Sequence, residues 1–194
     1  MARPATNRPG PDRPATDRPA TDQLGTYERD GDVVDLRYER HYPRPIETVW
    51  AALTDPTRLT DWLSAATVEP HQGGRYELFT ERPRPMTGRI TVWEPPRVLE
   101  YSWDTGDAPI TTVRWELSPD GAGTKLVLRH LGMQFHWVGL VLPGWHSLLE
   151  RLDGLLAGTP KPDSMERWRA LQAVYVAEYK LEGVLLDPPP GHGQ

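Results

Sequence analysis

His130 is the titratable residue whose position in the sequence best suits chemistry. It continues the alternation of Leu126 and Leu128, so we expect its side chain to point inward at the end of a strand. An inward imidazole could act as an acid or a base near neutral pH. The position also suits a histidine that only makes hydrogen bonds with its surroundings, and we favour that interpretation. His130 is therefore a candidate catalytic residue without a recognisable catalytic set around it.

The sequence gives no metal or phosphate motif. His136 and His146 are ten positions apart, Glu150 is the single acidic residue at helical ligand spacing from His146, and the chain has no cysteine. The glycines at 73 and 74 are not followed by the lysine of a phosphate-binding loop, so they favour a turn. We predict no metal site and no cofactor.

Composition narrows the class of protein. The net charge is −5 with mixed signs, and a nucleic-acid-binding protein usually shows a basic surplus or a basic stripe. No apolar run approaches the eighteen residues of a membrane span, and the N-terminus lacks the apolar segment of a secretion signal. We expect a cytoplasmic protein that neither binds nucleic acid nor spans a membrane.

The elements that must position these residues follow from hydrophobic periodicity. Alternation predicts a first strand over 33–42, and two short helices with apolar faces follow over 46–53 and 55–63. The period then returns to two, with turn residues between segments, which indicates an antiparallel sheet. The predicted strands are 66–69, 75–81, 86–94, 98–103, 110–117 and 124–130.

A long amphipathic helix follows the sheet at 144–158. Trp145, Leu149 and Leu152 lie on one face of it, and Gly158 provides a stop. Such a face needs a cover, and the inner face of the sheet is the natural one.

The two ends of the chain are predicted to lie outside this domain, which spans 33–158. Residues 1–30 are rich in proline and arginine and are expected to form a disordered arm. Residues 159–194 are expected to hold a linker, a further helix over 164–179 with Asp163 and Glu166 at capping-box spacing, and a frayed tail. The apolar stripe of that helix predicts docking on the domain, on a protein partner or on a second subunit in a homodimer.

Several short motifs occur in an order that resembles a known superfamily. They are 45–56 (PIETVWAALTDP), Trp62, 73–76 (GGRY), 88–90 (GRI), 95–103 (PPRVLEYSW), 123–126 (GTKL) and 144–149 (GWHSLL). Together they resemble the START-like or SRPBCC superfamily, in the branch of homologues of the activator of the heat-shock-protein-90 ATPase. The resemblance implies an α+β helix-grip fold, also called Bet v 1-like, with a curved antiparallel sheet around a long C-terminal helix and two short helices after the first strand.

The helix-grip resemblance places a cavity between the sheet and the long helix. The candidate ligand-binding residues, from strand parity and from this resemblance, are Tyr76, Leu78, Tyr101, Trp103, Trp115, Leu128, His130, Trp145 and Leu149. The same residues could instead simply fill the core, and for any single one of them we favour that interpretation. We predict a protein that binds a small apolar or aromatic molecule, without demonstrable catalysis. The alternatives are a polyketide-type cyclase, aromatase or dehydratase with His130 or a tyrosine as proton donor, and a chaperone cofactor or other protein-interaction module.

Overall fold

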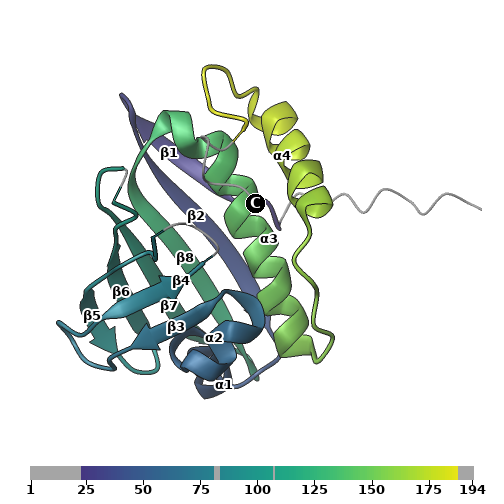
Figure 1. Cartoon of the computed structure of the whole chain (residues 1–194). Helices are drawn as coiled ribbons and strands as arrows, with labels where there is room; N and C mark the ends of the chain where they lie inside the picture. The colour runs from purple at the N-terminus through teal and green to yellow at the C-terminus, as the bar shows by residue number, and fades with distance from the viewer. Residues whose placement is uncertain (1–22, 81–83, 107, 188–194) are drawn as a thin grey trace, which may run out of the picture.

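A six-stranded antiparallel sheet curves around one long helix (Figure 1). The computed structural model describes residues 23–80, 84–106 and 108–187. The strands of the sheet, in spatial order, are β1 (Thr26–Asp30), β2 (Val33–Tyr42), β8 (Gly123–Gln134), β7 (Thr111–Asp120), β6 (Val98–Trp103) and β5 (Ile90–Glu94). A separate two-stranded sheet pairs β3 (Ala65–Val68) with β4 (Tyr76–Phe79). This is the helix-grip arrangement that the motifs imply.

Two short helices close one end of the sheet, near the C-terminal end of the long helix (Figure 1). They are α1 (Ile46–Thr54) and α2 (Pro56–Trp62). Asp55 caps α2 because its carboxylate accepts a hydrogen bond from the Thr57 amide at 2.8 Å. The Trp62 indole donates to the Ala52 carbonyl at 2.9 Å, which fixes the two helices to each other.

The core lies between the inner face of the sheet and helix α3 (Val138–Ala157). Trp145, Leu149 and Leu152 are buried on the helix, as its periodicity predicts, and they pack with Trp115 and Leu128 of the sheet in one cluster. The face of the sheet that alternation along the strands predicts to be buried therefore faces α3, as expected.

Helix α3 begins six residues earlier than predicted. The pattern favours a start at 144, because proline is common at the entrance of a helix, but the helix begins at Val138 and contains Pro143. Pro143 has no N–H to donate to the carbonyl of Gly139. That carbonyl accepts a hydrogen bond from Gln172 Nε2 at 2.9 Å instead. A contact from another helix thus satisfies the acceptor that the proline leaves open.

Strand boundaries differ from the predictions mainly at bends. Strand β8 continues past His130 to Gln134, through Gly132 with a φ of 79°, whose amide donates to Asp35 of β2. Strand β5 begins at Ile90 instead of residue 86, with isolated bridges before it. The register shifts close to each place, at Val34/Leu36 between β2 and β8 and at Ile90/Val92 between β5 and β6, which interrupts the regular alternation on which sequence prediction depends.

The disordered arm predicted over residues 1–30 includes residues that belong to the sheet. Residues 26–30 form the edge strand β1, which pairs with β2 from Thr26 opposite Arg37 to Asp30 opposite Val33. The strand is short and mostly exposed, so its sequence carries little hydrophobic signal. Residues 1–22 of the predicted arm lie outside the described residues.

The last helix, α4 (Met165–Tyr179), packs on the outer side of α3 (Figure 1). Ser164 is the cap, accepting from the Arg167 amide, in place of the capping box predicted at Asp163. Leu171 and Tyr175 are fully buried within the chain, so this part of the stripe docks on its own domain. Among residues 23–80, 84–106 and 108–187, no helix has the length and apolar character needed to cross a bilayer.

Replacing Gln172 by alanine is expected to destabilise the protein. The side chain amide also donates to the Leu186 carbonyl at 2.8 Å, so the change removes two hydrogen bonds and leaves the buried Gly139 carbonyl without its donor. We expect the free energy of unfolding to fall by about 1 to 3 kcal/mol, measured by urea denaturation. Arg169→Ala, on the exposed side of α4, is the control and should change it by less than about 0.5 kcal/mol. Equal midpoints for the two variants would contradict the assigned role.

Candidate functional site

A small pocket lies near the N-terminal end of α3, between the β6–β7 connection, the end of β8 and the 3-10 turn η2 (Phe135–Trp137). Its volume is about 80 Å³, and it is partly open to solvent. The residues around it are Trp103, Thr105, Ala108, Pro109, Thr111, His130, Gly132, Met133, Gln134, Trp137 and Val141. Large apolar side chains with a few polar groups are the usual lining of a small-molecule site.

His130 lies at the inner wall of this pocket and connects the sheet to the long helix. Its Nδ1 lies 3.0 Å from Trp145 Nε1 of α3, and its Nε2 lies 2.8 Å from Thr111 Oγ1 of β7. Both ring nitrogens are therefore hydrogen-bonded, and the side chain is 3% exposed. The inward orientation predicted from strand parity is confirmed.

The imidazole of His130 is neutral. Burial disfavours the charged form and lowers its pKa to about 3. The indole N–H of Trp145 can only donate, so it requires a lone pair on the imidazole nitrogen that it faces. At neutral pH the ring is thus a hydrogen-bonding group and carries no acidic imidazolium proton.

Tryptophan rings extend from the pocket into the core. Trp103, at the pocket wall, has its ring centroid 5.5 Å from that of Trp145 and 5.6 Å from that of His130. Trp145 in turn makes an edge contact with Trp115 at 5.6 Å, and Trp115 makes another with Trp62 at 6.1 Å. Such rings have few rotamers and large contact areas, so their packing restricts the movement of the side chains beneath the pocket.

Of the nine residues predicted to bind a ligand, Trp103 and His130 line this pocket. The others are buried in the core and pack against one another: Tyr76, Leu78, Tyr101, Trp115, Leu128, Trp145 and Leu149. Tyr76 stacks on Tyr101 with 4.0 Å between centroids and donates its hydroxyl to the Leu53 carbonyl at 3.0 Å. Their part in ligand binding stays a prediction. Trp145 does not line the pocket but is hydrogen-bonded to His130, which does.

Sequence reasoning missed several residues of the pocket. Thr111 shares the inward parity of Val113 and Trp115, so strand alternation could have identified it. Trp137 and Val141 lie between the strand predicted over 124–130 and the helix predicted over 144–158, where neither a helix nor a strand was predicted. Their position depends on the early start of α3.

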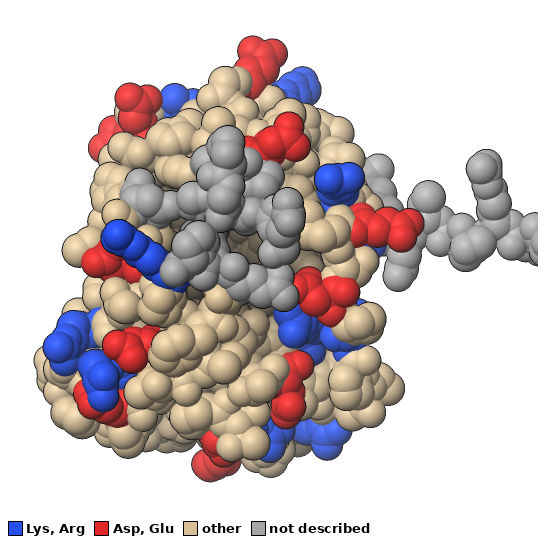
Figure 2. Space-filling model, viewed as in Figure 1, with Lys and Arg blue, Asp and Glu red and all other residues tan. Residues whose placement is uncertain are grey.

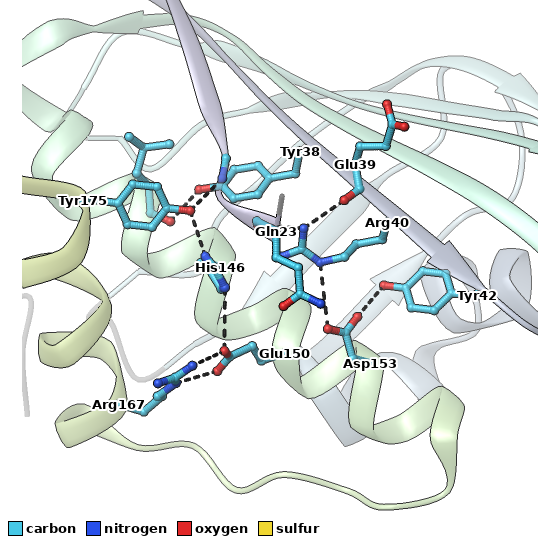
Figure 3. A network of polar contacts seen from close by, with 12 residues as sticks. Gln23, Tyr38, Glu39, Arg40, Tyr42, His146, Glu150, Asp153, Arg167 and Tyr175 are labelled. Atoms are coloured by element: carbon cyan, nitrogen blue, oxygen red, sulfur yellow. Dashed lines mark hydrogen bonds and ion pairs between the residues drawn. The ribbon is translucent and has the colours of Figure 1, made fainter. Parts of the chain in front are cut away.

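A network of buried polar side chains connects β2, α3 and α4 (Figure 3). The Tyr175 hydroxyl accepts from the Gly25 amide at 2.8 Å and lies 2.8 Å from His146 Nδ1, and the Tyr38 hydroxyl donates to the Leu142 carbonyl at 2.6 Å. Burial lowers the pKa of His146 to about 4, with the Arg40 charge acting in the same direction. Because these bonds connect distant parts of the chain, we assign this network to stability.

Arg40, also drawn in Figure 3, is a nearly buried cation beside Asp153. Its Nη1 donates to the carbonyls of Gln23 and Glu39 at 2.9 Å, and its Nε lies 3.8 Å from Asp153 Oδ2. The hydroxyl of Tyr42 donates to the same carboxylate at 2.8 Å. The adjacent groove, of about 620 Å³, holds paired charges and suits an apolar ligand less well than the pocket at His130.

Figure 2 shows acidic and basic side chains interspersed over the face of the molecule that it draws. Within the described residues, no three His, Asp or Glu side chains come together in a way that could hold a metal ion.

Comparison with known proteins gives one family and several similar structures. The sequence model of the family described as Activator of Hsp90 ATPase homolog 1-like protein matches residues 43–157. CalU16 from Micromonospora echinospora is 28% identical, over 79% of this chain and 93% of that chain, with a TM-score of 0.65. The protein encoded by gene BPP1335 of Bordetella parapertussis is 30% identical, over 86% of this chain and 96% of that chain, with a TM-score of 0.62.

A third structure is described as an HSP90 activator from Plasmodium falciparum. It is 25% identical, over 66% of this chain and 99% of that chain, with a TM-score of 0.55. The search of curated proteins gives no match.

The neutral state of His130 predicts how stability depends on pH. An imidazole in the unfolded chain has a pKa of about 6.5, so the unfolded state binds the extra proton as the pH falls below that value. With its folded pKa lowered to about 3, His130 contributes fully to stability above pH ~6.5, and this contribution is lost toward pH ~3. We expect His130→Gln to reduce the loss of unfolding free energy between pH 6.5 and pH 5 by about 1 to 2 kcal/mol, measured by urea denaturation.

His41 provides a control of opposite sign. A hydrogen bond to Asp120 raises the pKa of His41, so its contribution is present below pH ~6.5 and is lost as the pH rises. His41→Gln should therefore make the loss on acidification steeper. If His130→Gln left the pH dependence unchanged, the pKa of His130 would be the same in the folded and the unfolded chain, which would contradict the lowered pKa.

Proposed function

The chain belongs to the family of Activator of Hsp90 ATPase homolog 1-like proteins, and within this family we propose that it binds a small apolar or aromatic molecule. The observation that carries the proposal is the pocket at His130, where large apolar side chains line a space that also contains a few polar groups, among them His130 and Thr111. Apolar walls supply affinity in such sites, and a few fixed polar groups supply orientation.

The size of the pocket limits what enters it. Its volume of about 80 Å³ is smaller than the roughly 150 Å³ of a cavity that holds benzene. Since the pocket is partly open, we infer that one end of the ligand enters it while the rest lies outside. A substituent on an aromatic ring, or the end of a short chain, has the right size for the inner part.

The enzyme alternative has less support from the geometry. His130 is neutral, with its pKa lowered to about 3, and is hydrogen-bonded at both nitrogens, so it is a poor proton donor near neutral pH. The hydroxyl of Tyr76 donates to a backbone carbonyl in the core, and burial raises its pKa well above the usual value. Neither residue is presented to the pocket as an acid.

A larger side chain in the pocket should weaken the binding of a small aromatic molecule. We expect Val141→Phe to weaken binding of α-methylstyrene, a small aromatic probe, at least tenfold, because the added ring occupies the space that the probe uses. Binding can be followed by NMR through the indole N–H signals of Trp103 and Trp137. Val33→Phe adds the same bulk at a position that is 48% exposed and outside the pocket, so it should bind as the native chain does. Unchanged binding by Val141→Phe would exclude this pocket as the site.

The family description and the Plasmodium falciparum structure favour a second candidate function, stimulation of the Hsp90 ATPase. If the chain acts in this way, adding it to purified Hsp90 should raise the rate of ATP hydrolysis in a saturable manner. Val141→Phe is the useful comparison, since it separates a surface contact from a role of the pocket. An unchanged rate at about tenfold molar excess of the native chain would count against this function.

A further inference from the structure

We propose that the ligand of the pocket at His130 carries a neutral hydrogen-bond acceptor, such as a ketone, ester or amide carbonyl, and that the hydroxyl of Thr111 donates to it. This inference deepens the proposed binding function and rests on it. In the contact between Trp145, His130 and Thr111, the direction of donation is fixed at one group.

That group is the indole of Trp145. Its N–H lies 3.0 Å from His130 Nδ1 and can only donate, so Nδ1 accepts and carries no proton. A neutral imidazole must then carry its proton on Nε2. Nε2 lies 2.8 Å from Thr111 Oγ1, so His130 donates to the threonine oxygen. The indole thus sets the tautomer of the imidazole, and the imidazole sets the role of the hydroxyl.

The hydroxyl hydrogen of Thr111 is left to point elsewhere. Among the described residues, no acceptor for it is found, and Thr111 is one of the residues that line the pocket. Each donor in the series polarises the next, which makes the terminal hydroxyl a better donor. A half-buried donor of this kind is best satisfied by an acceptor on whatever occupies the pocket.

The surroundings favour a neutral acceptor over a charged one. None of the described residues around the pocket is Asp, Glu, Lys or Arg, and the imidazole beside Thr111 is uncharged. A carboxylate placed here would lose its hydration without gaining a cation. A carbonyl oxygen needs a single donor, which the hydroxyl supplies.

Two probes of almost equal shape test the inference. Acetophenone has a carbonyl oxygen where α-methylstyrene has a methylene group, so the pair isolates the hydrogen bond. We expect Thr111→Val, which keeps the shape and removes the hydroxyl, to weaken acetophenone binding about tenfold and α-methylstyrene binding less than twofold. Because each probe is compared with itself across variants, the different solubilities of the two probes in water cancel.

Two further variants serve as matched controls. Thr111→Ser keeps the hydroxyl and should bind acetophenone within about threefold of the native chain. Thr112→Val removes the hydroxyl at the neighbouring position of β7, which does not line the pocket, and should leave the binding of both probes unchanged. Retained binding of α-methylstyrene by Thr111→Val also shows that this variant folds.

The failures of the two proposals are distinguishable. If the native chain binds neither probe, the proposed binding function is wrong, and the inference falls with it. If the native chain binds α-methylstyrene but Thr111→Val weakens both probes equally or neither of them, the pocket binds apolar molecules and the acceptor inference alone is wrong. The same conclusion follows if Thr112→Val, instead of Thr111→Val, weakens acetophenone binding selectively.

Discussion

The contact of Trp145 with the inner face of the sheet is the interaction on which the rest of this structure depends. Its indole packs against Trp103 and Trp115, which fixes how α3 lies across the strands. The same side chain gives His130 a hydrogen bond in a place where an unsatisfied imidazole would be costly. One residue therefore contributes apolar packing to the core and polar order to the pocket, and the two cannot be changed independently.

Much of the fold could be predicted from the sequence because the alternation along strands and the period of helices are strong signals. The strands at 33–42 and 98–103 have the predicted bounds, and the buried face of α3 contains Trp145, Leu149 and Leu152 as expected. The site was predicted less well. Parity identified His130 and Trp103 as inward residues, but the distinction between filling the core and lining a pocket depends on packing that no local pattern records.

The errors at the two ends of the domain have physical causes. Pro143 suggested a helix entrance because a missing N–H is harmless there, whereas in the structure a side chain from α4 makes the missing hydrogen harmless inside the helix. Strand β1 was missed because an exposed edge strand needs no buried face and is held by backbone pairing with β2. Hydrogen bonds to another segment decide both cases, and the hydrophobic pattern of the segment itself does not reveal them.

The contact between Gln172 and the Gly139 carbonyl has a consequence for the pocket. The segment after α4 also donates from the Leu185 amide to the His136 carbonyl at 2.8 Å, so the C-terminal part of the chain supports both the turn that carries Trp137 and the start of α3, which carries Val141. The family match ends at residue 157, before this segment begins. One side of the pocket thus lies in the part of the chain that the family model matches, and the other is held by a segment beyond residue 157. A change in that segment can therefore alter the pocket while the pairing of the strands stays as it is.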